Sequence, residues 1–150
     1  MWRAISMKII TLLIFVLLIT VLPASCISAV KNEPFIHREW LLISYNGISR
    51  HDITSKPARV DLSQKSDGKT QHGNAEIGCS QLNFNYHFRA DGNIRFRSVS
   101  HTKTECSNNS QEDKLIKSLS ESRKFTLTGH YLLLTDGSGH QIKFIAADWD

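Results

Sequence analysis

Residues 82–89 alternate between apolar and polar side chains, and this pattern limits the fold more than any other in the chain. The apolar positions are Leu82, Phe84, Tyr86 and Phe88, and polar or basic residues occupy the positions between them. A period of two is that of a β-strand with one face buried. The sequence therefore predicts a sheet with one apolar face and one polar face.

A hairpin is predicted to follow this strand. Ala90-Asp91-Gly92 suits a three-residue loop, because Gly92 readily takes the left-handed conformation that such loops require. The return strand is expected from Asn93 to Val99, with Phe88 opposite Ile94 and Tyr86 opposite Phe96. That register gathers the basic side chains on the other face of the hairpin. We call His87, Arg89, Arg95 and Arg97 the basic stripe.

The remaining elements are shorter and less regular. Strands are predicted over residues 35–45, 58–62, 125–127, 131–134 and 141–145, and residues 48–57 are expected to form a loop. The segment 110–122 places Leu115, Ile116 and Leu119 on one side at helical spacing, which predicts an amphipathic helix packed on the sheet. Strands around one late helix indicate an α+β domain with an antiparallel sheet.

The N-terminus has the order of a secretory signal. Arg3 and Lys8 precede an apolar run from Ile9 to Leu22, and small residues follow it. The run is interrupted by threonines and is shorter than the roughly 18 apolar residues that favour a spanning helix, although a retained anchor is the alternative. We predict a signal peptide over 1–25, a tether over 26–34 and one domain over 35–150.

The chain contains three cysteines and is predicted to reach an oxidising compartment. Cys79 and Cys106 lie within the predicted domain, so a structural disulfide between them is expected. This bond would close a loop of about 28 residues and stabilise the fold by roughly 3.5 kcal/mol. Cys26 lies at the signal boundary, where two interpretations stay open: lipidation as the first residue of a lipoprotein, or simple cleavage nearby.

Several function classes find little support in the sequence. The net charge is +4, of which Arg3 and Lys8 contribute two, so only +2 remains after signal removal, without the clustered basic residues typical of nucleic-acid binding. The seven histidines include no pair at the i, i+2 or i, i+4 spacing common among metal ligands. No G-x-S-x-G motif is present, and Glu112 and Asp113 are expected at a helix start rather than at a catalytic pair. We therefore predict a nonenzymatic protein without a metal or cofactor.

The order and spacing of many small motifs resemble the META domain, or HslJ-like, family over residues 40–144. The residues that carry the resemblance are Gly78-Cys79, Gly92, Ile94, Thr102-Lys103, Cys106, Glu112, Leu115, Leu119, Phe125, Gly129, Leu132, Leu134, Asp136-Gly137, Ile142 and Phe144. The resemblance implies a strongly curled, half-barrel-like antiparallel sheet with one helix against it. It also implies a bacterial envelope protein, of a family linked to envelope stress and drug tolerance. This chain departs from the family pattern at Ser80, Thr104 and Glu105.

The functional prediction combines this resemblance with the basic stripe. We expect an exported protein in the periplasm or at the outer membrane, held there by a lipid on Cys26 if that residue is modified. Its role is expected to be noncatalytic, in binding or in envelope-stress support. The four basic side chains of the stripe could bind lipid phosphates or an acidic protein partner, or form an ordinary solvated face. The alternative function is a small carrier that holds a lipid or another apolar ligand within the curled sheet.

Overall fold

A computed structural model describes residues 33–64, 70–103 and 110–149. The signal segment 1–25, Cys26 and Cys106 lie outside the described residues, as does the tether except for Glu33 and Pro34. None of the helices within the described ranges is long and apolar enough to cross a membrane. The predictions on export and lipidation therefore stay predictions.

The described chain forms an antiparallel sheet with one main helix. Its strands are β1 (Glu39–Tyr45), β2 (Ile48–Ser49), β3 (Ala58–Asp61), β4 (Gln71–Ile77), β5 (Ser80–Phe88), β6 (Ile94–Lys103), β7 (Ser122–Thr128), β8 (Tyr131–Asp136) and β9 (Gln141–Ala146). The helices are α2 (Glu33–Ile36), α3 (Arg50–Ile53), α4 (Ser110–Ser120) and a terminal 3-10 turn, η1 (Ala147–Trp149). The predicted α+β class with an antiparallel sheet is confirmed.

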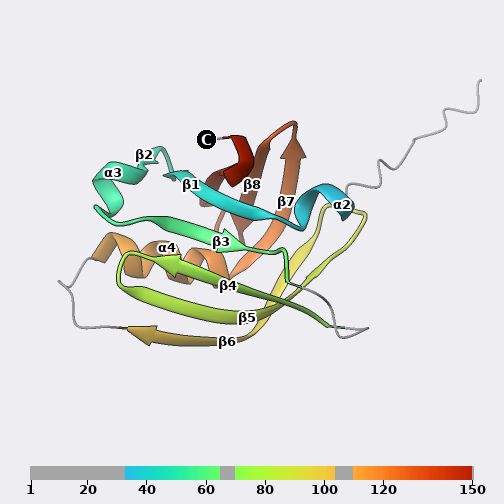
Figure 1. Cartoon of the computed structure of the whole chain (residues 1–150), viewed down its shortest axis with the longest axis horizontal. Helices are drawn as coiled ribbons and strands as arrows, with labels where there is room; N and C mark the ends of the chain where they lie inside the picture. The colour runs from blue at the N-terminus through green and yellow to red at the C-terminus, as the bar shows by residue number, and fades with distance from the viewer. Residues whose placement is uncertain (1–32, 65–69, 104–109, 150) are drawn as a thin grey trace, which may run out of the picture.

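The sheet curls until its two edges approach each other. The strand order is β6-β5-β4-β3-β1-β9-β8-β7, with β2 paired only to β1. Figure 1 shows β4, β5 and β6 on one side of the molecule and β7 and β8 on another. At the β5–β6 turn the edges touch, because the Phe125 amide donates to the Gly92 carbonyl at 2.8 Å and Asn93 bridges to Lys124. The half-barrel that the family resemblance implied is confirmed.

The concave face of the sheet forms the core. Inward side chains from the strands make one hydrophobic cluster that includes the fully buried Trp40 and Phe144, and α4 adds Leu115, Ile116 and Leu119. Helix α4 contacts β6, β8 and β9, so it covers the part of the concave face that the curl leaves open. The predicted burial of one side of this helix is confirmed.

Two local predictions near the N-terminal end of the domain are wrong. The strand expected from Phe35 starts at Glu39, because Glu33–Ile36 form a short helix instead. Pro34 is tolerated in the first turn of a helix. Trp40 Nε1 donates a hydrogen bond to the Ile36 carbonyl at 2.9 Å and so ties this helix to β1. The loop expected over 48–57 contains β2 and α3. Elements of two and four residues are too short to show a period in the sequence.

Strand β4 was not predicted, and its composition explains why. Its outward positions are polar and its inward positions include Gly73 and Ala75, so no apolar alternation marks it. Gly73 is small because Phe84 on the next strand occupies the space where a side chain would lie: a Cβ at this position would be 2.6 Å from Phe84 Cε2 and 2.9 Å from the Asp61 carbonyl oxygen. Strand β4 therefore cannot be identified from its own sequence, and only its pairing with β3 and β5 shows it.

Candidate functional site

The β5–β6 hairpin carries the basic stripe on its convex, outward face. The predicted register is confirmed, with Phe88 opposite Ile94 and Tyr86 opposite Phe96. All four stripe residues are exposed, and His87 lies directly opposite Arg95. Facing cationic side chains repel one another and weaken a strand pair when both are charged. The stability of the β5–β6 strand pair therefore does not explain why basic residues are concentrated on this face.

An open hollow lies along three of these side chains. Its volume is about 470 Å³, and it is lined by Thr70, Asn85, Tyr86, His87, Arg95, Arg97 and Ser98. Sequence reasoning did not select Thr70, Asn85 or Ser98. Asn85 could have been found from its outward position in the alternation, whereas Thr70 precedes the unpredicted strand β4. The fourth stripe residue, Arg89, lies beyond the hollow at the turn.

A β-bulge in β6 shapes one side of this hollow. One extra residue lies in β6 between the pairs Asn83–Ser100 and Asn85–Arg97, and Ser98 there has a φ of 52°. Bulges bend a strand and redirect its side chains. His72 on the neighbouring strand β4 contacts Asn85, which lines the hollow: His72 Nδ1 and Asn85 Oδ1 are 2.7 Å apart.

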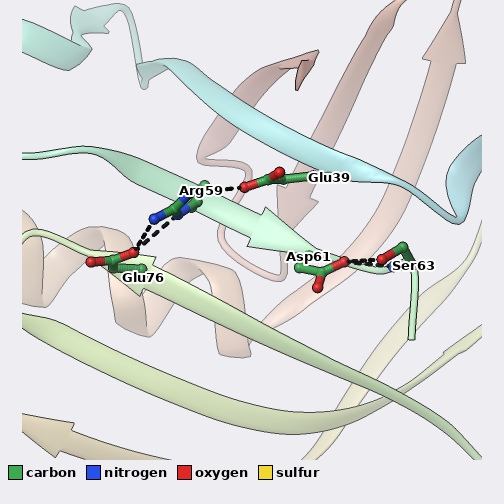
Figure 2. Close-up of polar contacts among 5 residues, drawn as sticks. All are labelled: Glu39, Arg59, Asp61, Ser63 and Glu76. Carbon is green, nitrogen blue, oxygen red and sulfur yellow. Dashed lines mark hydrogen bonds and ion pairs between the residues drawn. The ribbon is translucent and has the colours of Figure 1, made fainter. Parts of the chain in front are cut away.

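Arg95 and Arg97 of the stripe differ from Arg59, another arginine on the outward face, because their charges are not neutralised. Figure 2 shows Arg59 on β3 between two acids on adjacent strands, Glu76 at 2.7 Å and Glu39 at 3.3 Å. Hydrogen bonds to Glu76 and Glu39 raise the pKa of Arg59 further. Among the described residues, by contrast, no ion pair or hydrogen bond engages the side chain of Arg95 or Arg97.

Arg89 is the stripe residue that lies closest to an acidic side chain, but its ion pair with Asp91 is weak. Its Nε lies 3.8 Å from Asp91 Oδ2, and the two side chains are 63% and 51% exposed. An exposed pair at this distance contributes little to stability. The basic stripe thus presents available cationic donors to solvent.

On the inner side of the same strand, Tyr86 anchors a buried polar contact. Its hydroxyl donates to the Leu62 carbonyl at 2.7 Å and lies 3.0 Å from His37 Nδ1. Because the hydroxyl proton is used on Leu62, His37 must donate through Nδ1. Burial and the nearby charge of Asp61 raise the pKa of Tyr86 to about 12, so this group stays protonated and structural.

A third polar cluster contains Ser118, Asp136 and His140, the residue types of a serine-hydrolase triad. Their spatial arrangement is not that of a triad. Ser118 Oγ donates to Asp136 Oδ2 at 2.7 Å, and His140 Nδ1 contacts the same oxygen at 2.9 Å. A triad needs the imidazole between the hydroxyl and the carboxylate, so that it can take the hydroxyl proton. Here the carboxylate lies between the other two groups and joins α4 to the β8–β9 turn.

Asp136 is held as an ion by these donors. Its Oδ1 accepts the backbone amides of Ser138 and His140 at 2.8 and 2.9 Å. Burial alone would raise its pKa, but hydrogen bonds from Ser118, His140 and these amides outweigh burial and lower the pKa to about 2. The residue is therefore a charged structural anchor at neutral pH.

The acids expected at the start of the helix have different surroundings. Asp113 is exposed and pairs with Lys103 at 3.0 Å, whereas Glu112 is buried, and its carboxylate occupies the space that a side chain at Gly78 would need. The segment with Gly78 and Cys79 thus packs on α4. Ser80 pairs with Lys103, which brings Cys79 to the end of β6 from which the chain continues toward Cys106. This register supports the disulfide, which stays a prediction.

The histidines are dispersed in the structure as well as in the sequence. Within residues 33–64, 70–103 and 110–149, no three His, Cys, Asp or Glu side chains are grouped so that they could hold a metal ion. His130 stacks on the exposed Trp149 at a ring distance of 3.5 Å, and His37 is engaged with Tyr86.

Comparisons with known proteins identify the domain. A family model described as META domain matches residues 33–149. The chain is similar to a protein solved by NMR, with 19% sequence identity and a TM-score of 0.60; the match covers 80% of this chain and 97% of that one. It is also similar to a Burkholderia xenovorans protein solved by NMR, with 16% identity and a TM-score of 0.56; this match covers 74% of this chain and 82% of that one. A third similar structure is the crystal structure of a DUF4847 family protein from Bacteroides vulgatus, with 17% identity and a TM-score of 0.50. The match covers 76% of this chain and 95% of that one. No curated protein matches the chain.

Proposed function

Because the chain belongs to the META domain family, we propose that it is a noncatalytic exported protein whose domain binds an anionic component of the cell envelope through the basic stripe. The observation that carries the proposal is the contrast between the stripe and Arg59. Arg59 has two acidic partners, whereas Arg95 and Arg97 line an open hollow without an acid among the described residues. The resemblance to HslJ-like proteins supports including an envelope-stress role in this proposal.

Export is supported by the N-terminal sequence. The charged start, the apolar run and the small residues before Cys26 have the order of a signal peptide. Intact mass of the protein expressed with its own signal in a Gram-negative host tests this point. A mass increase equal to a lipid on Cys26 supports an anchored form, and a mature mass without lipid supports a released form. An uncleaved chain contradicts the cleaved signal peptide and favours the retained anchor.

A noncatalytic role is supported by how the polar clusters are used. The buried carboxylate of Asp136 is occupied by four donors, and the Tyr86 hydroxyl joins the strand to Leu62. In both clusters the groups are engaged with each other rather than directed at a reactant. Their geometry is that of structural contacts.

The basic stripe has the size and charge to bind a phosphate-rich surface. Guanidinium groups bind phosphate oxygens through two parallel hydrogen bonds. Each arginine near an anionic lipid surface contributes about 1 kcal/mol, so Arg89, Arg95 and Arg97 together would contribute about 3 kcal/mol, or about 100-fold in affinity.

Vesicle binding tests this proposal directly. The exported protein carries Cys26→Ser so that binding reports the domain rather than a lipid, and the vesicles mix phosphatidylglycerol with phosphatidylcholine. We expect binding that is lost on pure phosphatidylcholine and weakened about 100-fold by Arg89→Gln/Arg95→Gln/Arg97→Gln. The matched control removes three basic residues elsewhere, Arg50→Gln/Lys56→Gln/Lys143→Gln. Equal affinity of the stripe variant and the wild type would contradict the proposal.

The carrier alternative would need an apolar space inside the curl. Side chains of one continuous hydrophobic cluster occupy the concave face, and the hollow beside the stripe opens outward, on the other side of the sheet. These observations favour binding at the surface. Retention of a hydrocarbon ligand by the purified protein, detected by native mass spectrometry, would favour the carrier instead.

A further inference from the structure

A second hollow lies away from the basic stripe, between α4 and two turns of the sheet. Its volume is about 420 Å³, and its walls come from α4, from the β1–β2 turn and from the β8–β9 turn. It shares no lining residue with the hollow beside the stripe. A volume of this order is within the usual range for small-molecule pockets.

The helix contributes a polar wall to this hollow. Gln111, Lys114 and Lys117 follow one another at intervals of three residues and therefore lie on one side of α4. Both lysines are exposed, and neither has an ion pair or hydrogen bond to another described side chain. Lys103, in contrast, is paired with Asp113 on the same helix. Two available ammonium groups thus line the pocket.

The opposite wall presents an oriented imidazole. Asp136 accepts from His140 Nδ1 at 2.9 Å and from Ser118 at 2.7 Å, which fixes the β8–β9 turn against α4. With Nδ1 used on the carboxylate, Nε2 is the nitrogen of His140 left for a ligand. Asp136 keeps its negative charge, which its four hydrogen bonds stabilise without cancelling, so an anion is expected beside the lysines of α4 rather than beside this carboxylate.

The third wall is the β1–β2 turn. Asn46 and Gly47 both have positive φ, 49° and 82°, and the Asn46 amide donates to the Gln141 carbonyl at 2.7 Å. This turn places Tyr45 and Ile48 at the pocket beside the imidazole, since the Tyr45 and His140 ring centroids are 6.2 Å apart. The pocket therefore combines cationic groups with a partly apolar wall, while Glu121, the residue after the end of α4, adds a carboxylate acceptor.

We propose that this pocket binds a small polar acid, whose carboxylate or phosphate lies between Lys114 and Lys117 and whose hydroxyl or amino group donates to His140 Nε2. Both lysines supply charge-assisted hydrogen bonds to the anionic group. Glu121 accepts a further donor of the ligand, which favours a hydroxylated or amino acid over a simple anion. The site is independent of the basic stripe.

The experiment is a titration of the exported protein, followed by amide chemical shifts in NMR. The probes are D-glucuronate as a hydroxylated carboxylate, D-glucose as its uncharged match, and inorganic phosphate. We expect saturable shifts for glucuronate at residues of α4 and of the β8–β9 turn, and none for glucose. Lys114→Gln/Lys117→Gln should weaken this binding about tenfold or more, since it removes two charged hydrogen-bond donors.

Control variants separate a site from general attraction of anions. Arg123→Gln/Lys124→Gln removes the same charge from exposed positions on β7 and should leave the affinity for glucuronate unchanged. His140→Ala should weaken glucuronate more than phosphate, because phosphate needs the lysines but not the imidazole acceptor. Saturable phosphate binding at these residues without glucuronate binding would support the pocket and assign it to phosphate compounds.

Three results would overturn the proposal. They are the absence of saturable shifts with both anions, equal shifts with glucose and glucuronate, and equal weakening by the lysine variant and the β7 control. None of these results bears on vesicle binding by the basic stripe.

Discussion

The charge of Asp136 should stabilise the fold by an amount that depends on pH. Its pKa falls from 3.8 in the unfolded chain to about 2 in the folded protein, and at about 1.4 kcal/mol per pKa unit this difference is about 2 kcal/mol. Because the folded pKa is the lower one, the contribution is complete above about pH 4 and is lost as the pH falls toward about 2. Asp136→Asn removes the charge and keeps the shape.

The variant should therefore be less stable than the wild type by about 2 kcal/mol at neutral pH, with a difference that shrinks on acidification. Urea unfolding at a series of pH values, followed by fluorescence of the buried Trp40 and by near-ultraviolet circular dichroism, measures the free energy of unfolding of both proteins. Asp52→Asn is the control, because Asp52 is an exposed acid on α3.

The decisive observation is how the stability difference between the two proteins changes with pH, rather than its size at one pH. If the charge of Asp136 is responsible, the curves of wild type and Asp136→Asn converge near about pH 2. A difference that stays constant from neutral to acidic pH would refute the electrostatic account, and would mean that the amide fails only because it cannot accept from Ser118 and His140 together.

Further predictions concern the core and the cysteines. Gly73→Ala should lower the free energy of unfolding by about 2 kcal/mol, because the added Cβ would collide with Phe84 and the Asp61 carbonyl. Gly137→Ala is the control and should leave it unchanged, because no atom lies within 4 Å of the added Cβ there. Equal urea midpoints for the two variants would contradict this prediction. Tyr86→Phe should cost about 1 kcal/mol and remove the tyrosine that ionises near pH 12 in an absorbance titration; persistence of that late ionisation would contradict the assignment. Cys79→Ser should destabilise the protein by roughly 3.5 kcal/mol and abolish the two-dalton mass change on reduction, and free thiols at Cys79 and Cys106 in the wild type would show that the disulfide is absent.

The strongest periodic signals predicted the local structure well. Alternation over residues 82–89 and the Ala90-Asp91-Gly92 loop predicted β5, its turn and the pairing with β6, because a buried face forces apolar side chains to every second position. The same alternation predicted that the basic stripe lies on one outward face. Helix α4 was found for the corresponding reason at helical spacing.

Elements without a period of their own were missed or misassigned. Strand β4 carries Gly73 and Ala75 inward because Phe84 fills the space beside it, so its sequence resembles a loop. The turns α2 and α3 are too short to show periodicity, and each is held by a buried residue, Ile36 and Ile53. Their conformations depend on tertiary packing.

The sites divide in the same way. The basic stripe could be predicted because its four residues lie on two strands joined by a short hairpin. The pocket on α4 could not, because Asn46, Lys114 and His140 are far apart in the chain and meet only when the sheet curls around the helix. The Ser118–Asp136–His140 cluster is equally long in range, and only its geometry distinguishes an anchor from a triad.

The sequence predicted the elements whose side chains repeat with a regular period and the resemblance to the META domain family, and its export signal stays a prediction. Local chemistry decides these features, because periodicity and charge order act within one segment. Only the folded chain shows which cations have no acidic partner, which carboxylate is buried and where hollows open. These properties depend on side chains from distant segments that share one small volume, and no single segment contains that information.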